Sequence, residues 1–213
     1  MGGILLAIAA GIPWTLALTG VSFAIGAVLG IGLCALRVSR SGLLRFVGAS
    51  VILLVRSIPP ILWLFVIFFG IGAEVLSIGP FAAAAIGLGL ITAAHMAEIY
   101  RGALSAVQAG QWEAAIVLGL PARSRFLDII GPQMLRIALP SAATSVIGLL
   151  KDSAVASTIG VTEMAFAASH VTQRTSHGLG VFAITGALYI AISLPIAAAA
   201  RWADLRLRVA VAR

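Results

Sequence analysis

Charge is the scarcest property of this chain. Only 10% of its 213 residues are Asp, Glu, Lys or Arg, whereas 61% are hydrophobic and the mean hydropathy is +1.13. A soluble domain carries about 25% charged residues, so the composition excludes an ordinary soluble protein. Because a bilayer offers no water to unpaired backbone groups, apolar segments cross it as helices. The sequence therefore predicts an all-α integral membrane protein.

Other absences exclude several chemistries. The single cysteine, Cys34, rules out an internal disulfide and gives no metal framework. The chain has no G-x-x-x-x-G-K-[ST] loop for ATP and no G-x-S-x-G elbow. His95 and Glu98 lie three residues apart on one helical face, but no second pair accompanies them, so no metal site is predicted. The net charge of +7 would suit nucleic acid, yet in a membrane chain arginine is more typical of cytoplasmic loops.

Five apolar segments are candidate membrane spans. A single helix over residues 4–36 would be about 50 Å long, too long for one crossing and too short for two. We therefore expect residues 1–12 to be an interfacial lead-in, residues 13–205 to be one transmembrane domain, and residues 206–213 to be a basic cytoplasmic tail. Gly26 and Gly30 give the first span a small face for helix packing. The spans cover approximately residues 13–36, 58–71 with the helical stretch before it, 81–100, 137–161 and 180–200.

Arginine is concentrated in alternate connections between these spans. It occurs after the first, third and fifth spans, whereas residues 72–80 have none and residues 162–179 have only Arg174. The positive-inside tendency then places the N-terminus outside and the C-terminus in the cytoplasm. No basic residue precedes Arg37, which argues against a secretory signal. His170 and His177, on either side of Arg174, are expected in a solvated outer loop.

The cytoplasmic connection 102–136 is predicted to contain two short helices. The first covers residues 111–118 and ends at Gly119, which suits the left-handed position after a helix, while Pro121 blocks its continuation. The second covers residues 123–130, where basic and apolar positions are mixed. Two such helices at the membrane surface favour a docking site for a cytoplasmic partner; the alternative is a simple connecting loop.

The sequence "QWEAAIVLGL" in this connection resembles the conserved cytoplasmic loop of ABC-importer permeases. That family's next motif is Ile-x-Leu-Pro, and here Gly131 stands in place of the leucine. "AEIYRGAL" (97–104) and "LLKDSAVASTIGV" (149–161) resemble motifs of the polar amino-acid subfamily. "VRSIPPILWLFVIFFG" (55–70) departs from a related motif at Ser57, Ile58 and Pro60. The resemblance implies that the ATPase-coupling residues are Gln111, Glu113, Ala114, Ala115 and Gly119.

The resemblance also implies a fold, partners and a location. The fold is that of a type I ABC-importer permease with about five spans, in a bacterial inner membrane. The partners are a dimer of ATPase subunits, a second permease subunit that is identical or related, membrane lipid, and a periplasmic or lipid-anchored binding protein that delivers an amino acid. ATP and magnesium would bind the partner ATPase, so we expect no cofactor in this chain and no enzymatic activity of its own.

Lys151, the only lysine, and Asp152 interrupt an apolar run. A lysine near the bilayer centre is costly unless it is paired or faces water, so it indicates a functional site. Glu98 is the obvious partner for Lys151, and a pathway containing these charges would complement both ends of an amino acid. The alternative is a Lys–Glu pair that only locks two helices together. The predicted substrate-pathway residues are Glu98, Lys151, Asp152, Ile58 and Val155.

The predicted substrate is a zwitterionic amino acid with a neutral or polar side chain. Such a substrate needs no charge beyond those named, whereas a basic or acidic side chain would need another. A different class of function is an autonomous secondary carrier or a membrane-embedded enzyme. No internal repeat favours a carrier, and no catalytic constellation favours an enzyme.

Overall fold

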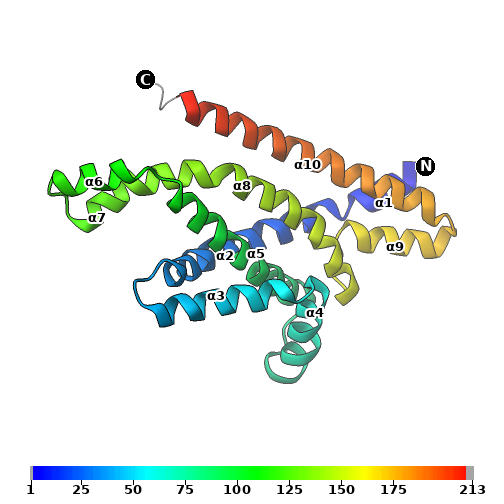
Figure 1. The fold of residues 1–213 in the computed structure, drawn as a ribbon. Coiled ribbons are helices and arrows are strands. Elements are labelled where there is room, and N and C mark those ends of the chain that lie inside the picture. The colour runs from blue at the N-terminus through cyan, green and yellow to red at the C-terminus, as the bar shows by residue number, and fades with distance from the viewer. Residues whose placement is uncertain (1, 210–213) are drawn as a thin grey trace.

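All regular secondary structure in the described part of the chain is helical (Figure 1), which confirms the all-α prediction. The computed structural model describes residues 2–209, with the side chains of 73–76 and 203–209 excepted. Four helical segments within it are long and apolar enough to cross a membrane, and a bent pair of shorter helices makes a fifth. The longest helices are α2 (Ile12–Arg37), α5 (Pro80–Ser105), α8 (Gly131–Asp152) and α10 (Gly178–Val209).

Helices α2 and α5 pack closely because glycine removes side chains from their contact. A Cβ atom at Gly26 would lie 2.5 Å from the Cβ of Thr92, and one at Gly30 would lie 2.8 Å from the Cβ of Met96. Gly89 on α5 is equally close to Ile25. The small face predicted for the first span is therefore confirmed, and its partner is α5.

The second span is bent. Helix α3 (Gly42–Ser57) and the helix that begins with α4 (Pro60–Phe65) meet at 97°, and a π-helical segment (Val66–Leu76) continues α4. Ile58, in the bend, has an extended backbone, which is the conformation favoured before a proline such as Pro59. The indole N–H of Trp63 donates to the carbonyl of Val55 at 3.1 Å and braces the bend. The predicted helical lead into this span is present, but it arrives almost at a right angle.

The first residues form a separate helix, α1 (Gly2–Ala9), which packs on two helices from the other end of the sequence. Its Ile8 is fully buried in a cluster with Met164, Ala168 and Val181. Gly11, at the junction with α2, approaches the chain at Met164 so closely that an added Cβ would lie 2.6 Å from that backbone nitrogen. Residues 1–12 were predicted as a lead-in to the first span, and α1 is a helix joined to α2 through a short break.

Helix α9 (Met164–Thr175) stands where the sequence predicts a loop, so the loop is wrong, although His170, Arg174 and His177 are exposed as expected. The side chain of Glu163 caps the helix by accepting a hydrogen bond from the backbone N–H of Phe166 at 2.8 Å. Met164 and Ala168 are buried one turn apart, against α1 and α10. His170 and Arg174 therefore lie on a helix, and only His177 lies in the turn that follows.

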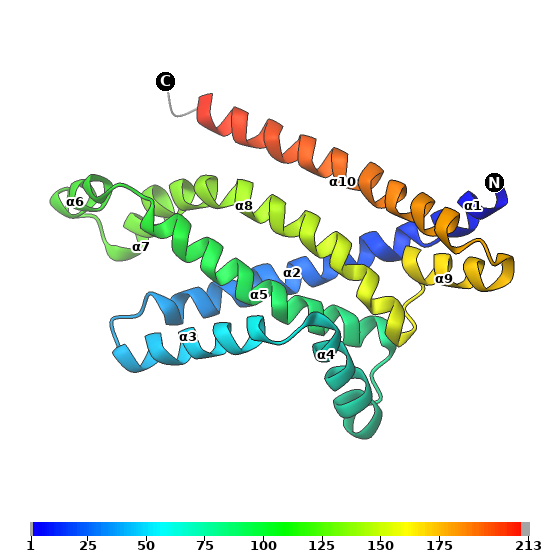
Figure 2. The same ribbon diagram turned by 45° about the vertical axis from the view of Figure 1, so that its right-hand side comes forward.

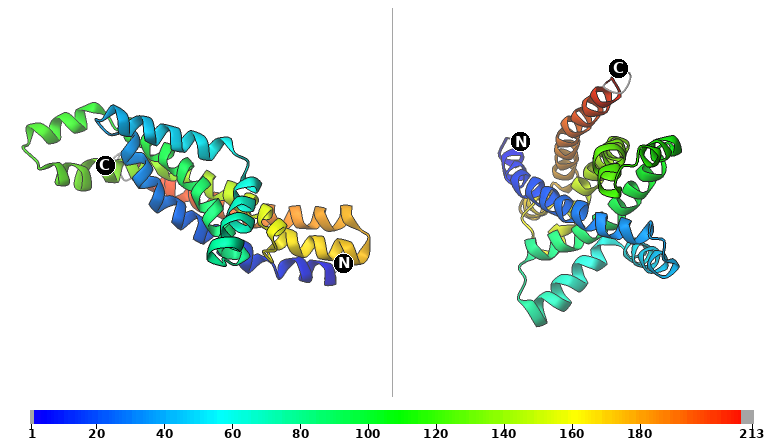
Figure 3. Two further views of the ribbon diagram at one scale, coloured as in Figure 1. Left: turned by 90° about the horizontal axis from the view of Figure 1, so that it is seen from below. Right: turned by 90° about the vertical axis from the view of Figure 1, so that its left-hand side faces the viewer.

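The molecule is elongated, with its connections gathered at two ends. The α2–α3 turn lies near α6 (Ala109–Val117) and α7 (Ala122–Ser124) at one end, and α1 and α9 lie at the other (Figures 1 and 2). Figure 3 shows the same separation seen from below. The elements that carry Arg40, in the α2–α3 turn, and Arg123, in α7, consequently share one end.

Candidate functional site

The predicted coupling residues lie on or just after α6, an exposed helix at that arginine-rich end. Glu113 and Ala114 are exposed, whereas Ala115 is buried and holds the helix to the rest of the chain. The tip of α6 carries an apolar surface, because 57% of Ile116, 85% of Val117 and 72% of Leu118 is exposed. In water such a surface is costly, so an apolar tip beside a carboxylate is typical of a docking site.

Gly119 ends α6 as the sequence predicts. Its φ angle is +67°, in the left-handed region that glycine adopts without steric cost. The backbone N–H of Leu120 then donates to the carbonyl of Ala115 at 3.2 Å, and that of Gly119 donates to Ile116 at 2.9 Å. These bonds satisfy the last carbonyls of the helix and reverse the chain.

Two contacts fix α6 relative to the membrane-spanning part of the chain. The side chain of Gln133, near the start of α8, donates to the side-chain oxygen of Gln111 at 3.2 Å. Helix α6 also packs on a π-helical segment (Arg125–Ile130), whose Ile130 is fully buried. The second short surface helix was predicted as a separate element, which is wrong: this segment runs without a break into α8. A movement of α6 would therefore act directly on α8.

A cleft of about 410 Å³ lies between α3, α5 and α8. Its polar lining combines charged or imidazole side chains with three hydroxyl groups from α8. The lining residues used below are Arg56, His95, Glu98, Ser141, Thr144 and Ser145.

Glu98 lines this cleft, but its partners differ from those predicted. Its Oε1 accepts from Nε of Arg37 at 3.0 Å, and its Oε2 lies 2.7 Å from an Nη nitrogen of Arg101. The predicted Glu98–Lys151 pair is absent among the described side chains. The ion pair that joins two helices is instead Arg37–Glu98, between α2 and α5. Since two arginines already neutralise Glu98, it has little remaining capacity to bind an ammonium group.

Lys151 and Asp152 lie where α8 changes into a 3-10 helical segment (Ser153–Ile159). Both side chains are exposed, and neither makes a hydrogen bond or ion pair with the part of the chain that the structure describes. The hydroxyls of Ser153, Ser157 and Thr158 bond to carbonyls three residues earlier, each at 2.7 Å. Gly160, with φ of +92°, ends the segment. This tightening leaves the two charges projecting from the end of a regular helix.

Two other predicted pathway residues occupy different surroundings. Ile58 is half-buried in the bend between α3 and α4, and Val155 packs against the core cluster that contains Leu64 and Ala156. On a continuous α-helix Val155 would lie on the same face as Lys151. It lies instead in the 3-10 segment, where a residue four positions later is turned away by about a third of a turn.

The α8 side of the cleft was not predicted from the sequence. Ser141, Thr144 and Ser145 follow the i, i+3, i+4 spacing of one helical face in an otherwise apolar span. That polar stripe is a signal that sequence reasoning could have found. The sequence did not predict that Arg37 and Arg56 lie near Glu98, because their positions follow from the packing of α2 and α3 on α5.

An exposed docking helix at one end and a polar cleft between apolar helices define a membrane transport subunit that works with separate partners. The chain belongs to the family described as binding-protein-dependent transport system inner membrane components, whose model matches residues 22–209. This membership confirms the resemblance seen in the sequence.

Named relatives and a solved structure agree with the family. The chain is 37% identical over 182 residues to the probable amino-acid ABC transporter permease protein YckA of Bacillus subtilis, covering 85% of this chain and 80% of the relative. It is 33% identical to the arginine ABC transporter permease protein ArtQ of Haemophilus influenzae, with 76% of this chain and 78% of that one covered. The crystal structure of an amino acid ABC transporter with histidines superposes with a TM-score of 0.86 at 28% identity, covering 94% of each chain. The fold is that of a type I ABC-importer permease, as predicted.

Proposed function

We propose that this chain is the membrane-spanning subunit of an ATP-driven importer that delivers an amino acid to the cytoplasm. The observation that carries the proposal is α6. Its exposed apolar tip beside Glu113, fixed to α8 through Gln111 and Ile130, suits docking to a separate ATPase and has no use in an autonomous carrier.

The proposed assembly contains two permease subunits, identical or related, and two ATPase subunits. ATP and magnesium bind the ATPase, and no cofactor is assigned to this chain. A periplasmic or lipid-anchored binding protein delivers the substrate at the end that carries α1 and α9. This orientation puts the N-terminus outside and the C-terminus in the cytoplasm of a bacterial inner membrane, in accord with the arginines around α6.

The proposed substrate is a zwitterionic amino acid with a neutral or polar side chain. Lys151 and Asp152 offer one charge of each sign that no described side chain pairs with, and a carboxylate and an ammonium group would complement them. Relatives named for arginine, octopine and L-cystine transport support an amino acid or a derivative as the substrate class. Glu98 contributes by holding Arg37 and Arg101 at the cleft rather than by binding the ammonium group.

The test is ATP-dependent uptake by the assembled transporter in proteoliposomes, with its binding protein added outside. Labelled-substrate uptake is competed by each of the twenty amino acids. We expect the strongest competition from neutral or polar amino acids, because the site has no spare charge for a charged side chain. Competition only by arginine, lysine or glutamate would refute the substrate assignment, and uptake without the ATPase would refute the importer.

A further inference from the structure

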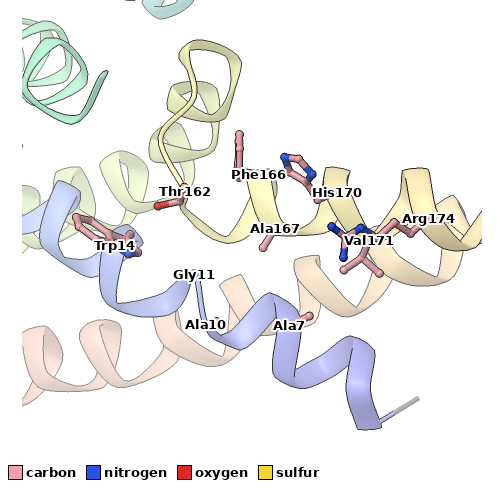
Figure 4. Close-up of a pocket in the computed structure, with 10 residues that line it drawn as sticks. All are labelled: Ala7, Ala10, Gly11, Trp14, Thr162, Phe166, Ala167, His170, Val171 and Arg174. Atoms are coloured by element: carbon pink, nitrogen blue, oxygen red, sulfur yellow. The ribbon is translucent and has the colours of Figure 1, made fainter. Parts of the chain in front are cut away.

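A second cavity, of about 330 Å³, lies between the α1–α2 junction and α9, at the end of the molecule opposite α6 (Figure 4). Most of its lining is small or aromatic, including Ala7, Gly11, Trp14 and Phe166. Its polar groups are Thr162, His170 and Arg174. It is separate from the α3–α5–α8 cleft and from the α6 surface.

The cavity carries a positive charge that the chain does not neutralise. Arg174 is exposed, and no carboxylate among the described side chains forms an ion pair with it. The acid next to α9, Glu163, is fully buried and bonded to Phe166 and Tyr189. His170 lies one turn before Arg174, and its ring contacts that of Phe166 at a tilt of 54°, with centroids 4.5 Å apart. The cavity therefore presents a guanidinium and an imidazole beside apolar walls.

The position of the cavity along α2 corresponds to a membrane–water interface. Trp14 and Arg37 lie on one continuous helix, 23 residues apart in the numbering, so they are about 35 Å apart along its axis. This length is close to the thickness of a bilayer's hydrocarbon core. With Arg37 at one headgroup level, Trp14 reaches the other. The indole is 47% exposed, and its N–H has no acceptor within the described chain.

The surface next to the cavity is apolar. On α1, Leu5 is 45% exposed and Leu6 is 73% exposed, beside the cavity-lining Ala7. Exposed leucines next to a tryptophan are typical of a surface in contact with acyl chains and the headgroup region. A soluble anion would use only the charged end of the cavity, whereas a phospholipid would also cover its apolar walls.

We propose that this cavity binds the headgroup of an anionic phospholipid. Arg174 pairs with the phosphodiester, with His170 beside it, and the indole N–H of Trp14 donates to a glycerol or ester oxygen. The first acyl carbons pack against Phe166 and the alanines of the α1–α2 junction. The site couples α1 and α9 to the outer leaflet, independently of the substrate pathway and of the ATPase surface.

The test measures quenching of Trp14 fluorescence in the assembled transporter in lipid nanodiscs. Phospholipids brominated near the ester groups are added as phosphatidylglycerol or as phosphatidylcholine, and a Trp14→Phe transporter isolates the Trp14 signal by difference. We expect phosphatidylglycerol to quench at a several-fold lower mole fraction. Arg174→Gln should reduce that preference by roughly fivefold, the effect of one basic residue near an anionic surface. Arg40→Gln, which removes an exposed arginine from the α2–α3 turn, should not change it.

Several outcomes would overturn the proposal. Equal quenching by the two lipids, or an unchanged preference in Arg174→Gln, would exclude a headgroup site. Full competition by soluble glycerophosphoglycerol would indicate a free-anion site. A loss of binding-protein affinity in Arg174→Gln with the lipid preference intact would indicate a protein contact. Mass spectrometry of copurified lipid gives a second readout, which does not depend on folding of the Trp14 variant. We expect phosphatidylglycerol to copurify with the wild-type transporter but not with the Arg174→Gln transporter.

Discussion

Glu163 offers the most quantitative test of how the outer end of this protein is held together. The side chain is fully buried, its Oε1 accepts from the backbone N–H of Phe166 at 2.8 Å, and its Oε2 accepts from the hydroxyl of Tyr189 on α10 at 2.5 Å. The next residue, Met164, donates its N–H to the Oγ1 of Thr15 on α2 at 3.2 Å. The Glu163 carboxyl group thus joins α9 to α10, and the adjacent hydrogen bond from Met164 joins α9 to α2.

Replacing Glu163 by alanine would leave two half-buried donors, the backbone N–H of Phe166 and the hydroxyl of Tyr189, without their acceptor. A fully buried unsatisfied group costs about 1–3 kcal/mol, so Glu163→Ala should cost at most about 6 kcal/mol of stability. Glu163→Gln keeps the shape and an acceptor oxygen and removes the buried charge, so it should cost far less. The measurement is thermal unfolding of the purified chain in detergent, with Glu113→Gln, an exposed carboxyl on α6, as the matched control.

The pH dependence of this stability has a definite sign. Burial raises the pKa of Glu163 above its ordinary value of 4.5, although the hydrogen bonds from Tyr189 and the backbone oppose that rise. A carboxyl group with a raised folded pKa stabilises the fold fully below the unfolded pKa, and this stabilisation is lost as pH rises through the folded pKa. The wild-type Tm should therefore fall, relative to that of Glu163→Gln, as pH rises from 4 towards neutrality. An identical pH profile for the two proteins, or a Glu163→Gln as unstable as Glu163→Ala, would refute the reasoning.

Three further predictions address coupling, substrate and packing. Gly119→Val forces a β-branched residue into a left-handed conformation. It should reduce substrate-stimulated ATP hydrolysis by the reconstituted complex at least tenfold without preventing membrane insertion. Unchanged hydrolysis would contradict the docking role of α6. Lys151→Met should lower uptake strongly with little change in Tm, because Lys151 has no partner among the described side chains. Full transport by a stable variant would exclude Lys151 from the pathway. Gly30→Leu should cost several kcal/mol or prevent accumulation of the protein, since its Cβ alone would lie 2.8 Å from the Cβ of Met96. The control variant Gly32→Leu, whose side chain would enter open space, should be tolerated. Equal Tm values for the two variants would contradict the α2–α5 packing.

The features that the sequence predicted correctly all have local causes. Hydropathy over about twenty residues predicted the helical spans, because a bilayer imposes that length on every crossing. Gly119 and Pro121 predicted the end of α6, because a left-handed glycine and a missing N–H act on their own neighbours. The small face at Gly26 and Gly30 likewise indicated a close helix contact before its partner was known.

Only the tertiary structure decided which distant groups meet. Glu98 was expected to pair with Lys151, but it pairs with Arg37, 61 residues away, because the packing of α2 on α5 brings these two side chains together. Helix α9 depends on the Glu163 cap and on packing against Ile8 from the opposite end of the sequence. The residues of α9 considered alone therefore predicted a loop. The α3–α4 bend and the 3-10 segment after Asp152 were missed for the same reason. Hydropathy and turn residues determine where helices form, whereas the direction of a bend and the partner of a charge are set by contacts that exist only after the helices have packed.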